Sequence, residues 1–274
     1  MRTIDLHTHT RHSHGRDDAR ANVLAALDKG VDVLGFTEHA PRPAAYTYPS
    51  DYQDRLARNF PLYVAETRAL QAEFAGRIDV LVGAEFDFFP GYEAHIAHAI
   101  AAHAFDFVLG SVHFLENWGF DFAARDWEDL DNEVLFADYR HYFSLMRQMA
   151  SSGLFNVAAH LDLIKIFSIG AFTAWAATDT AQDCFCDVLE AMAAHNMALE
   201  ISSAGLRKPC AAIYPCPRVM TLARAMDLPI TFASDAHTAR DIAHGFADLV
   251  AYARSFGYGE AVLPLRSGFV SVPF

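Results

Sequence analysis

Short apolar segments alternate with amphipathic segments along the whole chain. The apolar segments are rich in β-branched residues and predict seven strands, at residues 3–9, 31–37, 78–85, 106–113, 154–160, 197–203 and 229–235. The segments between them repeat apolar positions at helical spacing and predict helices at about residues 19–29, 51–75, 91–102, 132–152, 174–196, 217–226 and 239–255. Two loops interrupt the alternation, a proline-rich one at 41–50 and an acidic, aromatic one at 116–131, and we expect an irregular apolar tail at the end.

This alternation of strand and helix predicts the architecture. Strands that alternate with helices form parallel sheets with right-handed crossovers. Seven such units favour a closed or distorted barrel over an open sheet, so we expect an α/β fold, a distorted seven-stranded TIM-like (β/α)7 barrel. No linker rich in Gly, Pro or Ser divides the 274 residues, and the prediction is a single domain over 1–274.

Candidate metal ligands lie at the ends of the predicted strands. In barrels of this kind the chemistry is found at the carboxyl ends of the strands. An H-x-H pair is weak evidence by itself, but here it starts a series that recurs at one strand end after another. Imidazole nitrogen and carboxylate oxygen are suitable ligands for Zn, Mn and Fe, and the series has more such side chains than one ion can bind. These strand-end residues are His7, His9, His39, Glu85, His113, His160, Asp235 and His237.

Two further acidic residues accompany this series. Asp5 lies on the same strand face as His7 and His9, because alternate residues of a strand share a face. It is either a polar residue low in the barrel or an acceptor that orients an imidazole from behind. Glu38 alternates away from His39, so we interpret it as structural or as a support for a ligand rather than as a ligand.

The composition of the chain limits the classes of partner that we expect it to bind. The formal net charge of −13 disfavours nucleic acid, because phosphate backbones are bound by basic surfaces. The longest apolar stretch, residues 166–177, is too short to span a bilayer, so we expect no membrane partner. Four cysteines in one third of the chain, without a C-x-x-C pair or a signal peptide, predict free thiols and a cytoplasmic location.

Short motifs around the strand ends resemble a known family. His7-Thr8-His9-Thr10 followed by His14-Gly15 is similar to the first motif of the PHP (polymerase and histidinol phosphatase) superfamily. Further motifs, which extend the resemblance from one end of the chain to the other, are similar to the monofunctional histidinol-phosphatase branch: Phe36-Thr37-Glu38-His39-Ala40-Pro41, Gly83-Ala84-Glu85, Gly110-Ser111-Val112-His113-Phe114-Leu115, Glu200-Ile201-Ser202-Ser203-Ala204-Gly205-Leu206-Arg207-Lys208 and Ser234-Asp235-Ala236-His237.

The resemblance implies a trinuclear metal site and adds His14 to the ligands named above. His12 is a competitor, but His14-Gly15 matches the motif better. Ala159 stands before His160 where relatives often have glycine, and alanine is small enough to keep His160 in the set. The expected cofactors are two or three divalent ions of Zn, Mn or Fe. They would supply a metal-bound hydroxide that attacks phosphorus, while the acid that protonates the leaving alcohol stays unassigned.

The resemblance also implies a small phosphate ester, L-histidinol phosphate of histidine biosynthesis, as substrate. Arg207 and Lys208 follow the sixth predicted strand and would bind its phosphate, unless they are ordinary surface charges. Trp118 and Asp121 lie in the acidic, aromatic loop and would receive the imidazole and the ammonium group, unless the loop only excludes water.

Three alternatives stay open at this point. The first is another PHP phosphoesterase, acting on nucleotides, oligonucleotides or phosphotyrosine. The second is a non-catalytic PHP module for structure or interaction, which the complete ligand series argues against. The third concerns assembly, because both a monomer and a small homo-oligomer fit the sequence.

Overall fold

Two parallel sheets form the centre of the molecule in the computed structural model, which describes residues 2–48 and 52–274. One sheet has the order β1-β2-β3 and the other the order β10-β9-β8-β5-β4. Every pairing within these two sheets is parallel, as predicted from the alternation of strands and helices. The strands are β1 (Ile4–Asp5), β2 (Val33–Phe36), β3 (Asp79–Val82), β4 (Glu85–Asp87), β5 (Leu109–Ser111), β8 (Val157–Ala158), β9 (Ala198–Ser202) and β10 (Ile230–Ala233).

The two sheets meet at both edges and close a barrel. At one seam the amide of Leu6 donates to the carbonyl of Phe232 at 3.0 Å. At the other seam the amide of Glu85 donates to the carbonyl of Glu38 at 3.0 Å. The predicted third strand is split into β3 and β4, which pair with different neighbours, so the barrel is distorted at this point. The predicted seven-unit barrel in one domain is confirmed.

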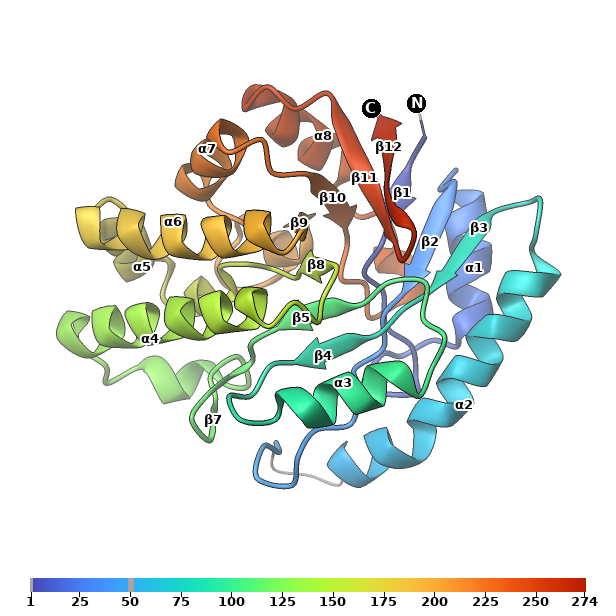
Figure 1. Cartoon of the computed structure of the whole chain (residues 1–274), viewed down its shortest axis with the longest axis horizontal. Coiled ribbons are helices and arrows are strands. Elements are labelled where there is room, and N and C mark those ends of the chain that lie inside the picture. Colours follow the sequence, from blue (N-terminus) through green and yellow to red (C-terminus); the bar gives the residue numbers. More distant parts are fainter. Residues whose placement is uncertain (1, 49–51) are drawn as a thin grey trace.

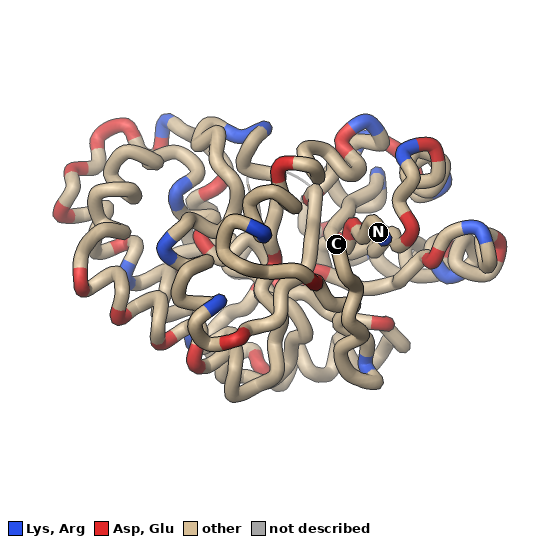
Figure 2. The backbone as a smooth tube through the Cα atoms, turned by 90° about the horizontal axis from the view of Figure 1, so that it is seen from above, with Lys and Arg blue, Asp and Glu red and all other residues tan. Residues whose placement is uncertain are grey.

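The helices lie around the outside of the barrel (Figure 1). Large apolar side chains from both layers join one continuous buried core. Acidic and basic positions are interspersed over the outer helices and loops (Figure 2). The helices are α1 (Ala19–Asp28), α2 (Tyr52–Glu73), α3 (Glu93–Ala101), α4 (Asn132–Ser151), α5 (Ile169–Ala176), α6 (Asp179–Ala194), α7 (Pro217–Ala225) and α8 (Phe246–Ser255). The predicted start of the second helix, Asp51, lies outside the described residues.

Two predicted helices are shorter than expected. The segment 174–196 contains the end of α5 and the whole of α6, because the Thr178 hydroxyl accepts a hydrogen bond from the amide of Ala181 at 3.2 Å and so caps a new helix. In the segment 239–255, α8 begins only at Phe246, because Gly245 takes a left-handed conformation with φ of 67°.

The expectation of an irregular tail was wrong. Strands β11 (Glu260–Leu265) and β12 (Gly268–Pro273) form an antiparallel hairpin. Gly268 has a φ of 116°, which favours glycine, and this allows the tight turn that brings it opposite Leu265. The hairpin lies beside the barrel near the chain start (Figure 1).

All four cysteines are free thiols, as predicted. Within residues 2–48 and 52–274, none of the helices is both long enough and apolar enough to cross a bilayer.

Candidate metal centre

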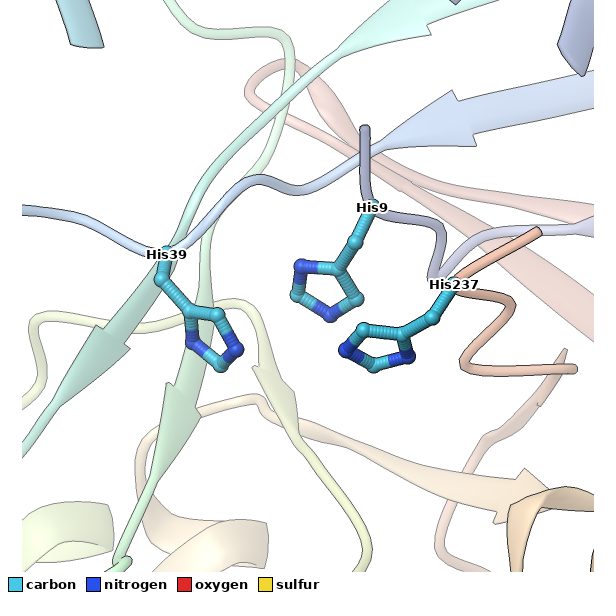
Figure 3. Close-up of side chains that lie close together, drawn as sticks. All are labelled: His9, His39 and His237. Atoms are coloured by element: carbon cyan, nitrogen blue, oxygen red, sulfur yellow. The ribbon is translucent and has the colours of Figure 1, made fainter. Parts of the chain in front are cut away.

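The predicted ligands converge at the carboxyl ends of the barrel strands. His9, His39 and His237 come from three separate segments, and their rings face one another (Figure 3). The His9 ring lies with its centroid 4.4 Å from that of His39 and 4.4 Å from that of His237. Parallel strands with a common direction explain why residues so far apart in sequence meet here.

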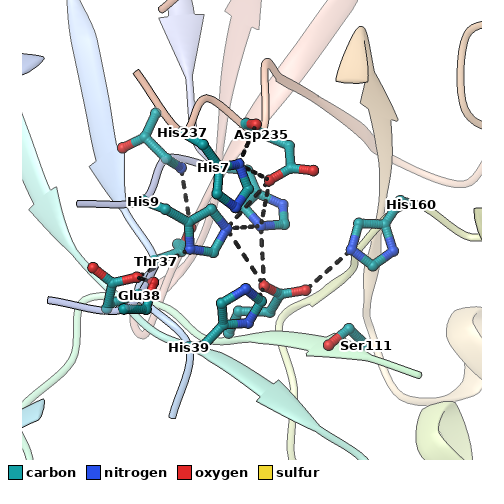
Figure 4. A network of polar contacts seen from close by, with 12 residues as sticks. His7, His9, Thr37, Glu38, His39, Ser111, His160, Asp235 and His237 are labelled. Atoms are coloured by element: carbon teal, nitrogen blue, oxygen red, sulfur yellow. Dashed lines mark hydrogen bonds and ion pairs between the residues drawn. The ribbon is translucent and has the colours of Figure 1, made fainter. Parts of the chain in front are cut away.

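Five imidazoles surround Glu85. Figure 4 shows His7, His9, His39 and His160 gathered from separate segments, with Asp235 beside them. Glu85 is fully buried at the start of β4, beside the split in the barrel. Its Oε2 lies 3.3 Å from Nε2 of His7, and its Oε1 lies 3.0 Å from Nε2 of His160. Imidazole nitrogens of three more histidines lie 3.0 to 3.6 Å from the same carboxylate: His9, His39 and His113.

The donor atoms divide into three groups of the size that holds a metal ion. They are His9, His39 and His237; His7, His9 and Glu85; and Glu85, His113 and His160, with all donor atoms of a group within 4.8 Å of one another. Because His9 and Glu85 each belong to two groups, neighbouring ions would share ligands. This geometry supports several ions in one cluster rather than separate sites.

Asp235 lies at the edge of the same cluster. Its Oδ1 lies 3.2 Å from Nε2 of His9 and 3.5 Å from Nδ1 of His237. Asp235 has a φ of 48° and His160 a φ of 22°, although neither is glycine. Strained backbone of this kind persists where the surrounding structure fixes it, and it concentrates at functional sites.

His14 reaches the rim of the cluster from the loop after β1. Its ring centroid lies 4.2 Å from that of His237, and its Nδ1 lies 3.0 Å from the hydroxyl of Tyr52. A Cβ at the following Gly15 would lie 2.7 Å from the Thr10 carbonyl, so this tight loop needs glycine. His12 instead places its Nε2 2.5 Å from the carboxylate of Glu66, away from the cluster.

The protonation of the imidazoles fits metal binding. Burial lowers the pKa of His39 to about 4 although Glu85 opposes it, and burial together with the charge of His9 lowers the pKa of His237 to about 3. These rings are neutral near pH 7 and offer lone pairs. Within the described residues, the buried His160 Nδ1 and His237 Nε2 have no hydrogen-bond partner. Neutral imidazoles and carboxylates are the donor set of divalent transition metals, so the residues fit such ions.

Two other candidate ligands would have to lose a proton before binding a metal ion. Burial lowers the pKa of His9, but hydrogen bonds to Asp235 and Glu38 raise it to about 9. Burial also lowers the pKa of His113, but the charges of Asp87 and Glu85 raise it to about 9. Metal binding at these two rings therefore releases protons.

An aromatic pocket opens beside the ligands. Its volume is about 280 Å³, and Asp121 and Lys208 line it together with several candidate metal ligands. Asp121 accepts a hydrogen bond from the hydroxyl of Tyr48 at 2.7 Å. The apolar and aromatic part of the wall consists of Tyr48, Tyr52, Phe122, Leu163, Ile166 and Tyr214.

Trp118 lies outside the lining of this pocket. It belongs to β7 (Trp118–Gly119), which pairs with β6 (Phe114–Leu115), and its ring packs against Trp127 with centroids 5.0 Å apart. Tyr48 and Phe122 line the pocket, whereas Trp118, which the sequence analysis placed at the substrate, does not. The loop at 41–50, which contributes Tyr48, carried no sequence signal of this role.

A second, larger cavity of about 830 Å³ shares Lys208, Asp235 and His237 with the aromatic pocket. Arg207 and Lys208 line it, together with Arg16, Arg240 and His244. One Arg207 nitrogen, Nη2, donates to the carbonyl of Ser234 at 2.7 Å and to that of Asp235 at 3.1 Å. Arg207 therefore holds the segment that carries Asp235 and adds positive charge next to it.

Comparison with known proteins identifies the family. The model of the PHP domain matches residues 5–204, which is most of the chain. The chain belongs to the PHP family. It is 38% identical over 257 residues to the probable histidinol-phosphatase of Deinococcus radiodurans, covering 92% of this chain and 93% of that protein. It is 28% identical to the histidinol-phosphatase of Bacillus subtilis, covering 90% of this chain and 97% of that protein.

A solved structure of the family has the same fold. The histidinol phosphate phosphatase of Lactococcus lactis, solved with zinc, L-histidinol and phosphate, matches with a TM-score of 0.77 at 20% identity. The match covers 98% of this chain and 99% of that one.

Acidic residues lie behind the candidate ligands. Glu38 places Oε1 3.2 Å from Nδ1 of His9, in agreement with a supporting role. Asp5 accepts hydrogen bonds from the amide and hydroxyl of Ser234 and from the amide of Ala243, so it joins strand ends and orients no imidazole through these contacts. Glu200 was missed as a functional residue, and its Oε2 lies 2.7 Å from Nδ1 of His7. A charged residue within the apolar segment of β9 was the available signal.

Proposed function

We propose that this PHP protein is a metal-dependent phosphomonoesterase that hydrolyses L-histidinol phosphate to L-histidinol and phosphate, as a step of histidine biosynthesis. The observation that carries the proposal is the arrangement around Glu85: three overlapping ligand groups open directly into a small aromatic pocket with an acidic side chain. The names of the Deinococcus and Bacillus relatives support the same reaction.

Two or three ions of Zn, Mn or Fe would be held by the imidazoles of His7, His9, His14, His39, His113, His160 and His237 and by the carboxylates of Glu85 and Asp235. When bound, such ions lower the pKa of coordinated water and stabilise charge on phosphoryl oxygens. Only two of these side chains are anionic, so the loaded centre stays positive inside a chain with a formal net charge of −13. That balance attracts a phosphate ester to an acidic protein.

Residues of the chain would orient the ester on both sides of the centre. Arg207 and Lys208 add fixed positive charge beside Asp235, where a phosphate can accept charge-assisted hydrogen bonds. Asp121 lies in the aromatic pocket and would receive the ammonium group of histidinol. The rings of Tyr48 and Phe122 would flank the imidazole of the same substrate. The aromatic walls also limit access of bulk water to the reacting end.

The size of the pocket favours a small alcohol. Its volume of about 280 Å³ is just below the usual range for small-molecule sites, which is about 300–1,000 Å³. A nucleotide would leave much of its base and sugar outside. The complete set of ligands also argues against a non-catalytic module, because such a module has no need of them.

Substrate profiling tests the proposal. Phosphate release by protein loaded with Mn or Zn should give a higher kcat/KM for L-histidinol phosphate than for AMP, phosphotyrosine or p-nitrophenyl phosphate. A clear preference for AMP or phosphotyrosine would assign the protein to another PHP phosphoesterase. Absence of turnover on all four esters would favour the non-catalytic module.

A further inference from the structure

Arg42 is a buried cation at the wall of the aromatic pocket. Only 7% of its surface is exposed, and its Nε donates to Oδ2 of Asp87 at 2.5 Å. Aromatic rings surround the guanidinium, whose central carbon lies 4.9 Å from the ring centroid of Tyr48 and 5.3 Å from that of Phe114. Cation–π contacts of this kind stabilise a charged group away from water.

Asp87 connects Arg42 to a candidate metal ligand. Its Oδ1 lies 2.6 Å from Nδ1 of His113, on the side of the carboxylate that does not face Arg42. The other ring nitrogen of His113, Nε2, lies 3.6 Å from Oε1 of Glu85, within the group formed by Glu85, His113 and His160. When a carboxylate holds one nitrogen of a ligating imidazole, the tautomer and the ring orientation are fixed for the metal.

The segment around Arg42 is suited to this task. Arg42 stands between Pro41 and Pro43, and both prolines restrict the backbone. Its carbonyl accepts a hydrogen bond from Nε2 of Gln53 at 2.9 Å, which ties the segment to α2. The same segment directly follows the candidate ligand His39, and through Asp87 it supports a second one, His113.

We propose that Arg42 is a positioning residue of the metal centre, which fixes Asp87 and thereby holds the ring of His113 with Nε2 directed at the bound ion. Without the guanidinium, Asp87 would be a buried anion with an uncompensated charge. The carboxylate would no longer be held in place by Nε of Arg42, and its contact with Nδ1 of His113 would be loosened. The inference rests on the metal centre of the proposed function and is independent of which phosphate ester the protein hydrolyses.

The test compares metal binding by variants of the full-length protein. R42M removes the guanidinium, R42K keeps a positive charge without the planar group, and D87N serves as the reference for a loosened His113. R68M is the matched control, because Arg68 also pairs with a carboxylate, that of Asp106 at 2.9 Å, but on the outer helix α2. Competition with a chromophoric chelator gives the number of bound Zn²⁺ ions and their dissociation constants. The visible spectrum of the Co²⁺ form reports ligand geometry.

We expect R42M to lower the affinity for one of the bound ions by about ten- to a hundredfold and to change the Co²⁺ spectrum. D87N should show a similar loss, R42K a smaller one, and R68M wild-type values. The double variant R42M/D87N should bind metal with the same affinity as D87N, because both residues act through His113.

If R42M binds Zn²⁺ with wild-type affinities and its Co²⁺ form has the wild-type spectrum, the inference is overturned. This holds even if the KM for the ester rises, because Arg42 would then contact the substrate instead of positioning a metal ligand. An additional loss in R42M/D87N would overturn the route through Asp87. If R42M does not fold, R42K decides in the same way, and wild-type metal binding by it contradicts the inference. A wild-type protein that binds no divalent ion overturns the proposed function as well, which separates the two failures.

Discussion

Nδ1 of His7 lies 2.7 Å from Oε2 of Glu200, although the two residues are 193 positions apart in the chain. The other oxygen of Glu200, Oε1, accepts a hydrogen bond from the amide of His160 at 2.9 Å. One carboxylate from β9 therefore orients the imidazole of one candidate ligand and the backbone of another.

Glu200→Gln should weaken metal binding without unfolding the chain. The amide keeps the size of the side chain but loses the charge that favours the proton on Nδ1 of His7. Loss of such a partner typically costs about ten- to a hundredfold in metal affinity. Dialysis against a chelator followed by elemental analysis measures the loss, with the exposed Glu190→Gln on α6 as control. Equal metal retention by both variants would show that Glu200 is not needed by the ligands.

His9→Ala and Asp235→Ala should each abolish turnover while the barrel remains folded. Both remove a donor from the cluster, and the loss should amount to several orders of magnitude in kcat. Circular dichroism checks the fold, and His98→Ala on α3 is a control outside the cluster. If either variant kept more than about a tenth of the wild-type kcat, that residue would not be an essential ligand.

Arg207→Ala and Asp121→Asn should affect different ends of the substrate. Arg207→Ala should lower kcat/KM for every phosphomonoester by roughly ten- to a hundredfold, because a charge-assisted contact to phosphate is lost. Asp121→Asn should lower it selectively for L-histidinol phosphate, because only this ester offers an ammonium group. The amide oxygen can still accept the hydroxyl of Tyr48, so the pocket wall is preserved.

Steady-state kinetics with L-histidinol phosphate and p-nitrophenyl phosphate separate these effects. If Asp121→Asn lowers kcat/KM equally for both esters, the loop that carries Asp121 only excludes water and does not recognise the ammonium group. An Arg207→Ala variant with unchanged kinetics would make Arg207 a surface charge.

Metal-free protein should be most stable around pH 6.5. His9 and His113 have pKa values raised to about 9, so their contribution is complete below the unfolded-state pKa of about 6.5 and is lost as the pH rises through about 9. His39 and His237 have pKa values lowered to about 4 and about 3, so the unfolded chain binds more protons and stability falls as the pH drops below about 6.5.

Thermal unfolding in the presence of a chelator, from pH 4 to pH 9, measures this profile. A melting temperature that rises steadily from about pH 6.5 to about pH 9 would contradict the protonation of His9 and His113.

The periodicity of the sequence predicts the barrel and the strand-end ligands because both depend on local spacing. His7 and His9 share a strand face, and the strand direction places them beside Asp235 and His237. The supporting acids were harder to identify. Asp5 and Glu200 are both charged residues of buried strands, and only the packing of the closed barrel decides that Glu200 reaches an imidazole while Asp5 reaches Ser234.

Loops gave the least reliable predictions. Nothing in the local pattern distinguishes Trp118, which packs against Trp127, from Tyr48, which lines the pocket. The role of Arg42 depends on Asp87, which is 45 positions away at the end of β4, whereas Arg42 lies in a loop. Such contacts follow from the tertiary structure, because residues in irregular segments have no periodic constraint on the direction of their side chains.

Reconstitution of metal-free protein tests the central claim most directly. The protein is stripped with a chelator and titrated with Mn²⁺ or Zn²⁺, and phosphate release from L-histidinol phosphate is measured at each step. The proposed centre predicts no turnover without metal and a rise that saturates only above one equivalent per chain, since the three ligand groups overlap at His9 and Glu85. Full turnover by protein that elemental analysis shows to be free of metal would contradict the claim.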